Sequence, residues 1–132
     1  MSVAVAPSGR LLLVEPQFVL RRTVSTMARE MGLAEVQEAT STAGAQRLLA
    51  GQRFDALLIA LDEDGEALKL LDRVRAGEAF QPPDLPVAAT VDSCDVELAL
   101  RLKALDVRRL LIKPFKVRGM LEAIAALREP AA

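Results

Sequence analysis

Short apolar runs alternate with longer segments of helical periodicity five times along this chain. The apolar runs centre on residues 10–16, 33–40, 56–61, 86–90 and 109–112. Each run is followed by apolar residues spaced three and four apart, as on one face of a helix. Strands that alternate with helices in this way pair as a parallel sheet, covered on both faces and joined by right-handed crossovers. The alternation therefore predicts a doubly wound α/β fold with five parallel strands and five helices.

Helix boundaries can be predicted at several places. Pro16 suits the first position of the first helix, and Gly32 is placed to end it. Ser41 or Thr42 is placed to cap a second helix that ends at Gly51. A fourth helix is expected from about Asp92, with Asp95 and Glu97 in its first turn. The expected buried stripe of the first helix consists of Leu20, Val24, Met27, Ala28 and Met31.

Length and composition indicate one folded domain. The chain has 132 residues, of which 52% are hydrophobic, enough for a single core. We expect the domain to span residues 9–128, with loose termini at 1–8 and 129–132. No apolar run approaches the roughly 18 residues that would span a bilayer. A basic region followed by an apolar stretch is missing at the N-terminus, so a secretory signal is not expected.

The residue types that are scarce exclude several kinds of chemistry. There is no histidine, so neither a histidine-dependent catalytic pair nor a zinc site built on imidazole is possible. Cys94 is the single cysteine, so no internal disulfide can form, and a reducing cytoplasmic location is expected. Aromatic residues make up 3%, which argues against a base-stacking surface for single-stranded nucleic acid.

Charge is distributed unevenly although the formal net charge is only −1. Residues 61–100 contain ten acidic and three basic residues, whereas residues 101–132 contain eight basic and three acidic ones. These counts predict an acidic and a basic region on different surfaces of one domain.

Polar residues gather where the predicted strands end. In a parallel sheet of this kind, ligands bind at the carboxyl ends of the strands. Those ends carry Glu15, the segment 60–62, Thr90 and Lys113. We therefore expect these residues to share one rim of the sheet.

The motifs VEPQFVLRR, FDALLIA, LPVAAT and IKPF, in this order, resemble the receiver domain of bacterial response regulators over about residues 10–127. The resemblance implies a flavodoxin-like strand order of 2-1-3-4-5. It also implies a function in two-component phosphorelay signalling. Receivers take a phosphoryl group onto an aspartate at the end of strand three. Two acids hold Mg²⁺, and a lysine and a hydroxyl bind the phosphoryl oxygens.

This chain departs from that pattern at several positions. The acceptor position, five residues beyond Asp55, is Ala60, which cannot act as a nucleophile. The acidic pair after strand one becomes Glu15 and Pro16, and the strand-four hydroxyl Thr90 comes one residue early. The position of the switch aromatic is Leu110. Only the segment from Lys113 to Phe115 matches in full, where the family usually has a cis bond before proline.

These departures predict an atypical receiver, a pseudo-receiver, that is not phosphorylated at the usual position, needs no cofactor and is not an enzyme. The alternative is a working receiver that uses Asp62 with weakly bound Mg²⁺ and Lys113, which would require strand three to be bulged or shifted by two residues. Lys113 could instead bind an anion or nucleotide, although no glycine-rich phosphate loop supports this. It could also simply pair with Glu15 or with an acid of the 62–64 loop.

A basic surface is expected on the fourth helix, fifth strand and fifth helix. By the resemblance, this is the face through which receivers dimerise or contact other proteins. It predicts a signalling partner, such as a histidine kinase or an output protein, or a homodimer; an ordinary solvated surface is the open alternative. Neither membrane association nor direct nucleic-acid binding is expected. The residues assigned to this face are Arg101, Lys103, Arg109, Leu110 and Lys116.

Overall fold

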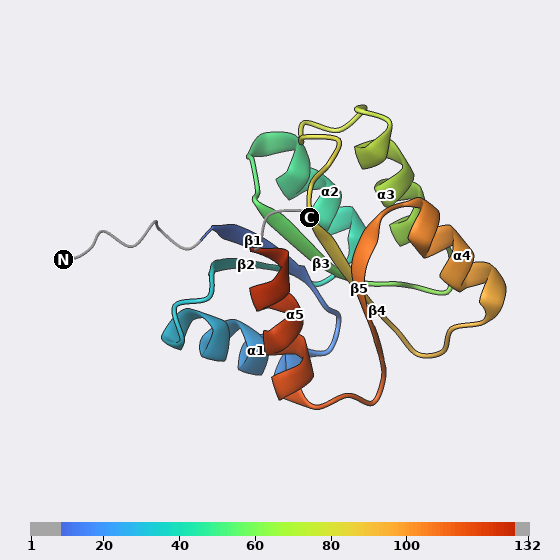
Figure 1. Ribbon diagram of the computed structural model, residues 1–132. Helices are drawn as coiled ribbons and strands as arrows, with labels where there is room; N and C mark the ends of the chain where they lie inside the picture. Colours follow the sequence, from blue (N-terminus) through green and yellow to red (C-terminus); the bar gives the residue numbers. More distant parts are fainter. Residues whose placement is uncertain (1–8, 129–132) are drawn as a thin grey trace.

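Five parallel strands form one sheet in the order β2-β1-β3-β4-β5, as the resemblance implies (Figure 1). The computed structural model describes residues 9–128, and the termini that we expect to be loose, 1–8 and 129–132, lie outside the described residues. The prediction of a doubly wound α/β fold is confirmed. The strands are β1 (Arg10–Val14), β2 (Glu35–Ala39), β3 (Ala56–Ala60), β4 (Val87–Val91) and β5 (Val107–Ile112).

Helices α1 and α5 cover one face of the sheet, and α2 and α3 cover the other, with α4 beside α3 (Figure 1). Because side chains alternate along a strand, Leu11 and Leu13 pack toward α1 and α5, whereas Leu12 and Val14 pack toward α2 and α3. The helices are α1 (Phe18–Glu30), α2 (Thr42–Gly51), α3 (Glu66–Arg75), α4 (Val96–Ala104) and α5 (Val117–Leu127). No helix within residues 9–128 is long and apolar enough to cross a membrane.

The buried face of α1 differs from the predicted stripe. Arg21, Val24, Ser25 and Ala28 are buried, whereas Met31 is 59% exposed. The helix is therefore rotated so that an arginine, and not the methionines, faces the sheet. The physical reason is that the Arg21 guanidinium finds polar partners below the helix, as described in the next subsection.

Two helices begin later than predicted, and one begins as predicted. Asp95 precedes α4 as its N-cap and does not lie in the first turn, because its carboxylate accepts a hydrogen bond of 2.8 Å from the Leu98 amide. Similarly, α1 begins at Phe18, two residues beyond Pro16. Ser41 caps α2 by accepting a hydrogen bond of 3.1 Å from the Gly44 amide, as its position predicts.

The edge strand β5 is irregular. Val87 pairs with Val107, but Ala88 pairs with Arg109, so Arg108 is an extra residue that forms a bulge. No residue of β5 is fully buried, in contrast to the central strands β3 and β4.

Candidate functional site

A pocket of about 420 Å³ lies at the carboxyl ends of the strands, and of the rim residues the segment 60–62 and Lys113 line it. Its wall is formed by the turn after β1, the loop between β2 and α2, the end of β3 and the residues that follow β4 and β5. The side chains that matter for chemistry here are Gln17, Thr42, Ala60, Asp62, Asp92 and Lys113.

Glu15 and Lys113 form an ion pair across this rim, with 2.9 Å between Lys113 Nζ and Glu15 Oε1. The Glu15 side chain is only 1% exposed and that of Lys113 is 18% exposed. The second carboxylate oxygen, Oε2, accepts a hydrogen bond of 2.9 Å from the Gln17 amide. Lys113 is therefore neutralised by a buried acid, the pairing that the sequence leaves open as the simpler role for this lysine.

This rim ion pair joins strands that are not neighbours. β1 and β5 are separated by β3 and β4, which places them roughly 14 Å apart at ordinary strand spacing. The contact can form only because two long side chains reach toward each other over the ends of the strands between them. At the end of β3, between β1 and β5, the side chain is only the methyl group of Ala60.

Ala60 and Thr90 lie side by side in the sheet. They are register partners at the ends of β3 and β4, so their side chains point to the same face. Thr90 is 1% exposed, and its hydroxyl oxygen has no hydrogen-bond partner among the described residues. The neighbour of this buried hydroxyl at the end of β3 is therefore an alanine, which has no group to hydrogen-bond with it.

Asp62 lies beyond the strand and is held by other groups. The shift of β3 that would carry Asp62 toward Lys113 is not present, because β3 ends at Ala60 in register with Thr90. One carboxylate oxygen of Asp62 accepts from the Thr42 hydroxyl at 3.0 Å and the other from the Ala67 amide at 3.1 Å. Burial raises the pKa of the Asp62 carboxyl, but these hydrogen bonds act in the opposite direction and leave that pKa below its ordinary value.

The residues around the pocket do not fit Mg²⁺. The ion prefers several carboxylate and carbonyl oxygens in octahedral geometry. Glu15 is already bound to Lys113, Pro16 has no side-chain oxygen, and Ala60 has none either. Within residues 9–128 no group of three or more acidic, cysteine or histidine side chains could hold a metal ion.

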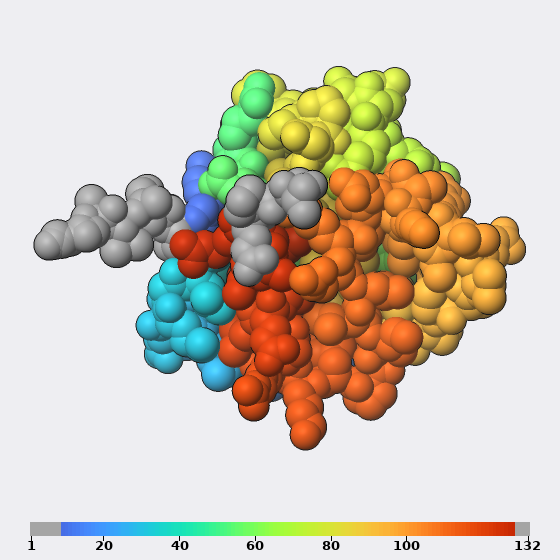
Figure 2. All heavy atoms as spheres, viewed as in Figure 1, coloured from blue at the N-terminus to red at the C-terminus, as the bar shows by residue number. Residues whose placement is uncertain are grey.

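The basic residues assigned to the partner face are distributed over three elements. Arg101 and Lys103 lie on α4, Arg109 and Leu110 lie on β5, and Lys116 directly precedes α5. Figure 2 shows this face toward the viewer, where the orange atoms of α4 and β5 continue into the red atoms of α5. The turn between β5 and α5 contains a cis bond before Pro114, as in the receivers that the sequence resembles.

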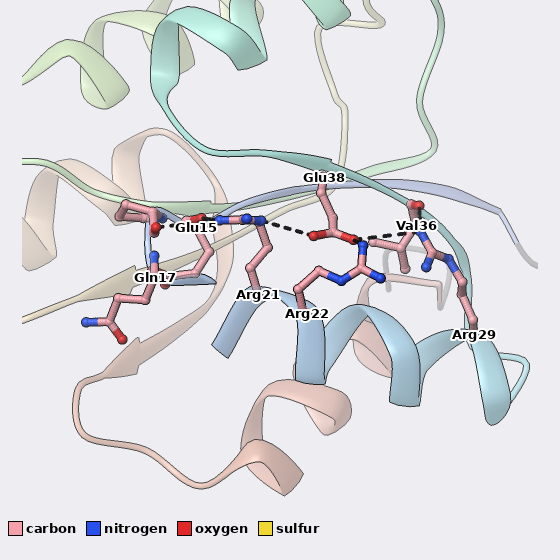
Figure 3. A network of polar contacts seen from close by, with 8 residues as sticks. Glu15, Gln17, Arg21, Arg22, Arg29, Val36 and Glu38 are labelled. Atoms are coloured by element: carbon pink, nitrogen blue, oxygen red, sulfur yellow. Dashed lines mark hydrogen bonds and ion pairs between the residues drawn. The ribbon is translucent and has the colours of Figure 1, made fainter. Parts of the chain in front are cut away.

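One buried contact beneath the rim was not expected from the sequence. Figure 3 shows Arg21 of α1 between Glu15 and Glu38, where Arg21 Nε donates to Glu38 Oε1 at 3.0 Å. Arg21 Nη1 donates to the Glu15 carbonyl oxygen at 2.9 Å. The signal that could have revealed it is an arginine at helical spacing with Val24 and Ala28, on the face that packs against the sheet.

Comparison with known proteins supports the fold. No protein-family model and no curated protein matches the sequence. A response regulator from Thermotoga maritima superposes with a TM-score of 0.75 at 21% identity, covering 91% of this chain and 97% of its own. The non-phosphorylated HemR receiver domain from Leptospira biflexa gives 0.76 at 24% identity, covering 93% and 98%. HP1043, an orphan response regulator of H. pylori, gives 0.78 at 17% identity, again covering 93% and 98%. The chain therefore has the fold of the response regulator receiver domains.

Proposed function

We propose that this chain is an atypical receiver domain of two-component signalling that works by protein contact and is not phosphorylated at the usual position. The observation that carries the proposal is Ala60 at the end of β3, where the fold would present the acceptor carboxylate. Phosphoryl transfer needs a nucleophilic oxygen aligned with phosphorus, and a methyl group offers none.

The surrounding groups support the same proposal. Mg²⁺ neutralises the phosphoryl oxygens during transfer, and this pocket offers no suitable set of ligands for it. Lys113, which would bind the phosphoryl group, is paired with the buried Glu15. A domain of this kind would be controlled by its concentration or by partner binding, without phosphate, metal or other cofactor, and would not be an enzyme. Its single cysteine suits a cytoplasmic location.

The alternative is a working receiver that takes phosphate on Asp62, with Mg²⁺ and Lys113. One observation favours it, since Asp62 and Lys113 line the same pocket. Against it, both oxygens of Asp62 already accept hydrogen bonds, and Lys113 forms an ion pair with Glu15. In-line attack would require Asp62 to give up its contacts with Thr42 and Ala67. It would also have to approach Lys113, whose positive charge is already paired with the carboxylate of Glu15.

Intact-mass measurement separates these two functions. The protein is incubated with acetyl phosphate and Mg²⁺, beside a receiver domain known to be phosphorylated, and its mass is recorded. We expect no phosphoryl adduct on this chain and an adduct on the control. An adduct that Asp62→Asn abolishes would establish the alternative.

We place the working surface on α4, β5 and α5. Lys103, Arg109 and Lys116 give it positive charge, and Ile112 on β5 and Leu100 on α4 are 52% and 62% exposed. Such a mixture suits an acidic protein partner, such as a histidine kinase or an output protein, or a second copy of the chain. A direct role in nucleic-acid binding is not proposed.

Sedimentation analysis of the wild type and Arg109→Glu tests this surface for self-association. If the face forms a homodimer, the variant should dissociate at concentrations where the wild type is dimeric. Arg47→Glu, a charge reversal at an exposed position of α2 and outside this surface, is the matched control. A wild-type dimer that Arg109→Glu leaves intact would place the interface elsewhere.

A further inference from the structure

The rim ion pair has a buried support on the opposite side of Glu15. Arg21 Nη1 donates to the carbonyl oxygen of Glu15 at 2.9 Å and reaches that of Pro16 at 3.5 Å. The guanidinium thus binds the backbone of the turn whose side chain meets Lys113. The position of the Glu15 carboxylate depends on this turn, since the Gln17 amide of the same turn donates to it.

Arg21 is in turn held by β2, at the edge of the sheet (Figure 3). Its Nε donates to Glu38 Oε1 at 3.0 Å, and both side chains are mostly buried, at 9% and 14% exposure. The other oxygen of Glu38 lies 3.2 Å from Arg22 and 3.9 Å from Arg29. Glu38 therefore has three cationic partners, and two of them, Arg22 and Arg29, are about half exposed.

Together these contacts form one continuous path along the rim, from Glu38 on β2 through Arg21 and Glu15 to Lys113 after β5. Every link is an ion pair or a hydrogen bond at no more than 3.0 Å. The path crosses the entire sheet, because β2 and β5 are its two edges. It ends at the turn that leads into α5, beside the basic partner face.

We infer that Arg21 and Glu38 are positioning residues: they fix the turn that carries Glu15, and through it Lys113 and the β5–α5 turn. In a phosphorylated receiver, ligands at the rim would tie these two turns together. In this chain the two turns are connected by the protein's own side chains, and Glu38 on the edge strand β2 fixes the position of Arg21 in that connection. The inference rests on the proposed function only in that no metal or phosphoryl group occupies the rim.

Because most side chains of this path are buried, a change at one of them should disturb the next. If Glu38 loses its charge, the guanidinium of Arg21 remains buried without its carboxylate partner. The arginine and the turn that it binds must then rearrange, and Glu15 belongs to that turn. A surface ion pair has no such consequence, because water replaces the lost partner.

Amide hydrogen exchange measured by NMR on Glu38→Gln tests the inference. The reporter is the Lys113 amide, which donates to the Val91 carbonyl at 2.7 Å. Its exchange rate is divided by that of the Leu57 amide, which donates to the Pro86 carbonyl at 2.9 Å, so that a uniform rise of both rates through global unfolding leaves the ratio unchanged. We expect the ratio to rise about threefold or more, as for coupled residues of one network.

Asp72→Asn is the matched control, since it removes an ion pair of 2.7 Å that lies on the surface and outside the path. The ratio should not change in this variant. Arg21→Lys, which keeps the charge but loses the fork of donors, should raise the ratio and covers the case in which Glu38→Gln does not fold.

An unchanged ratio in both Glu38→Gln and Arg21→Lys would overturn the inference, as would an equal rise in Asp72→Asn. The result is separable from the test of function. A phosphoryl adduct on Asp62 would overturn the proposed function whatever the exchange ratio shows, whereas an unchanged ratio would leave the proposed function standing.

Discussion

Two ion pairs of nearly equal length differ in how deeply their side chains are buried. Lys113 and Glu15 are separated by 2.9 Å, with side chains that are 18% and 1% exposed. Arg101 and Asp72 join α4 to α3 at 2.7 Å, with side chains that are 49% and 50% exposed. Distance alone would rank the surface pair first. Burial reverses the ranking, because water and salt screen the surface pair and can replace either partner.

The comparison also separates two meanings of stabilisation. Bringing Glu15 and Lys113 out of water costs free energy that their attraction offsets only in part. The rim pair is therefore no evidence of a large net gain in stability. Its consequence is conditional, since the carboxylate of Glu15, which is 1% exposed, is tolerated in the rim only while Lys113 is present.

Replacing Lys113 by methionine should give the largest effect. The substitution leaves the carboxylate of Glu15 buried and without its cation, which costs about 3–5 kcal/mol of unfolding free energy. Urea denaturation followed by circular dichroism measures the loss. A loss no greater than that of Arg101→Met would remove the distinction between the two pairs.

Replacing Glu15 by glutamine should have a smaller effect than Lys113→Met. The lysine that remains is partly exposed, so its ammonium group can turn toward water, and glutamine keeps an oxygen to accept from the Gln17 amide. We expect a loss of about 1–3 kcal/mol by the same measurement. An effect equal to that of Lys113→Met would show that the two ends of the pair are equally buried in solution.

Asp72→Asn should change the unfolding free energy by no more than about 1 kcal/mol. The difference from wild type should shrink further when urea denaturation is repeated in about 1 M salt, where the screening length falls to roughly 3 Å. Lys113→Met, measured in parallel, should keep most of its effect. A salt-resistant loss in Asp72→Asn would mean that the surface pair is better shielded than its exposure indicates.

The smallest effect should be that of pH on Asp62, a rim acid held by hydrogen bonds without a cation. Its folded pKa lies below the ordinary aspartate value, despite burial, because of the donors Ala67 and Thr42. The contribution to stability is therefore fully present above the unfolded pKa and is lost as pH falls through the lowered folded pKa. Carbon NMR titration of the Asp62 carboxyl should show this low pKa. A Thr42→Val variant should raise it, and no change would exclude the hydroxyl as a cause.

The sequence predicts local features of the fold well. The five strands, the Ser41 cap and the end of α1 near Gly32 depend on short-range patterns, and the structure confirms them. The face of α1 is predicted correctly at Val24 and Ala28 and wrongly at Met27 and Met31, because counting apolar residues places the methionines inside, whereas packing places Arg21 there. A buried arginine depends on a partner seventeen residues away, which no local pattern specifies.

In the candidate site, too, the sequence predicts which residues come together but not which of them pair. The resemblance to receivers aligns Ala60 with the acceptor position, and the strand ends bring Glu15, Thr90 and Lys113 to one rim. The choice of Glu15 over the 62–64 loop as the partner of Lys113 could not be made from the sequence, because it depends on how Thr42 and Ala67 hold Asp62. Whether these residues function as proposed remains a prediction for the experiments above.

The extra residue at position 108 also limits how this domain can assemble. An uncovered border strand offers unpaired backbone groups on which foreign chains can nucleate fibrils, and a kink bearing adjacent arginines is a recognised protection against such growth. Arg108 and Arg109 supply both the kink and the charge on β5. Any assembly through β5 would therefore be held together by side-chain contacts. It would form a complex of limited size and not a sheet that continues from one chain to the next.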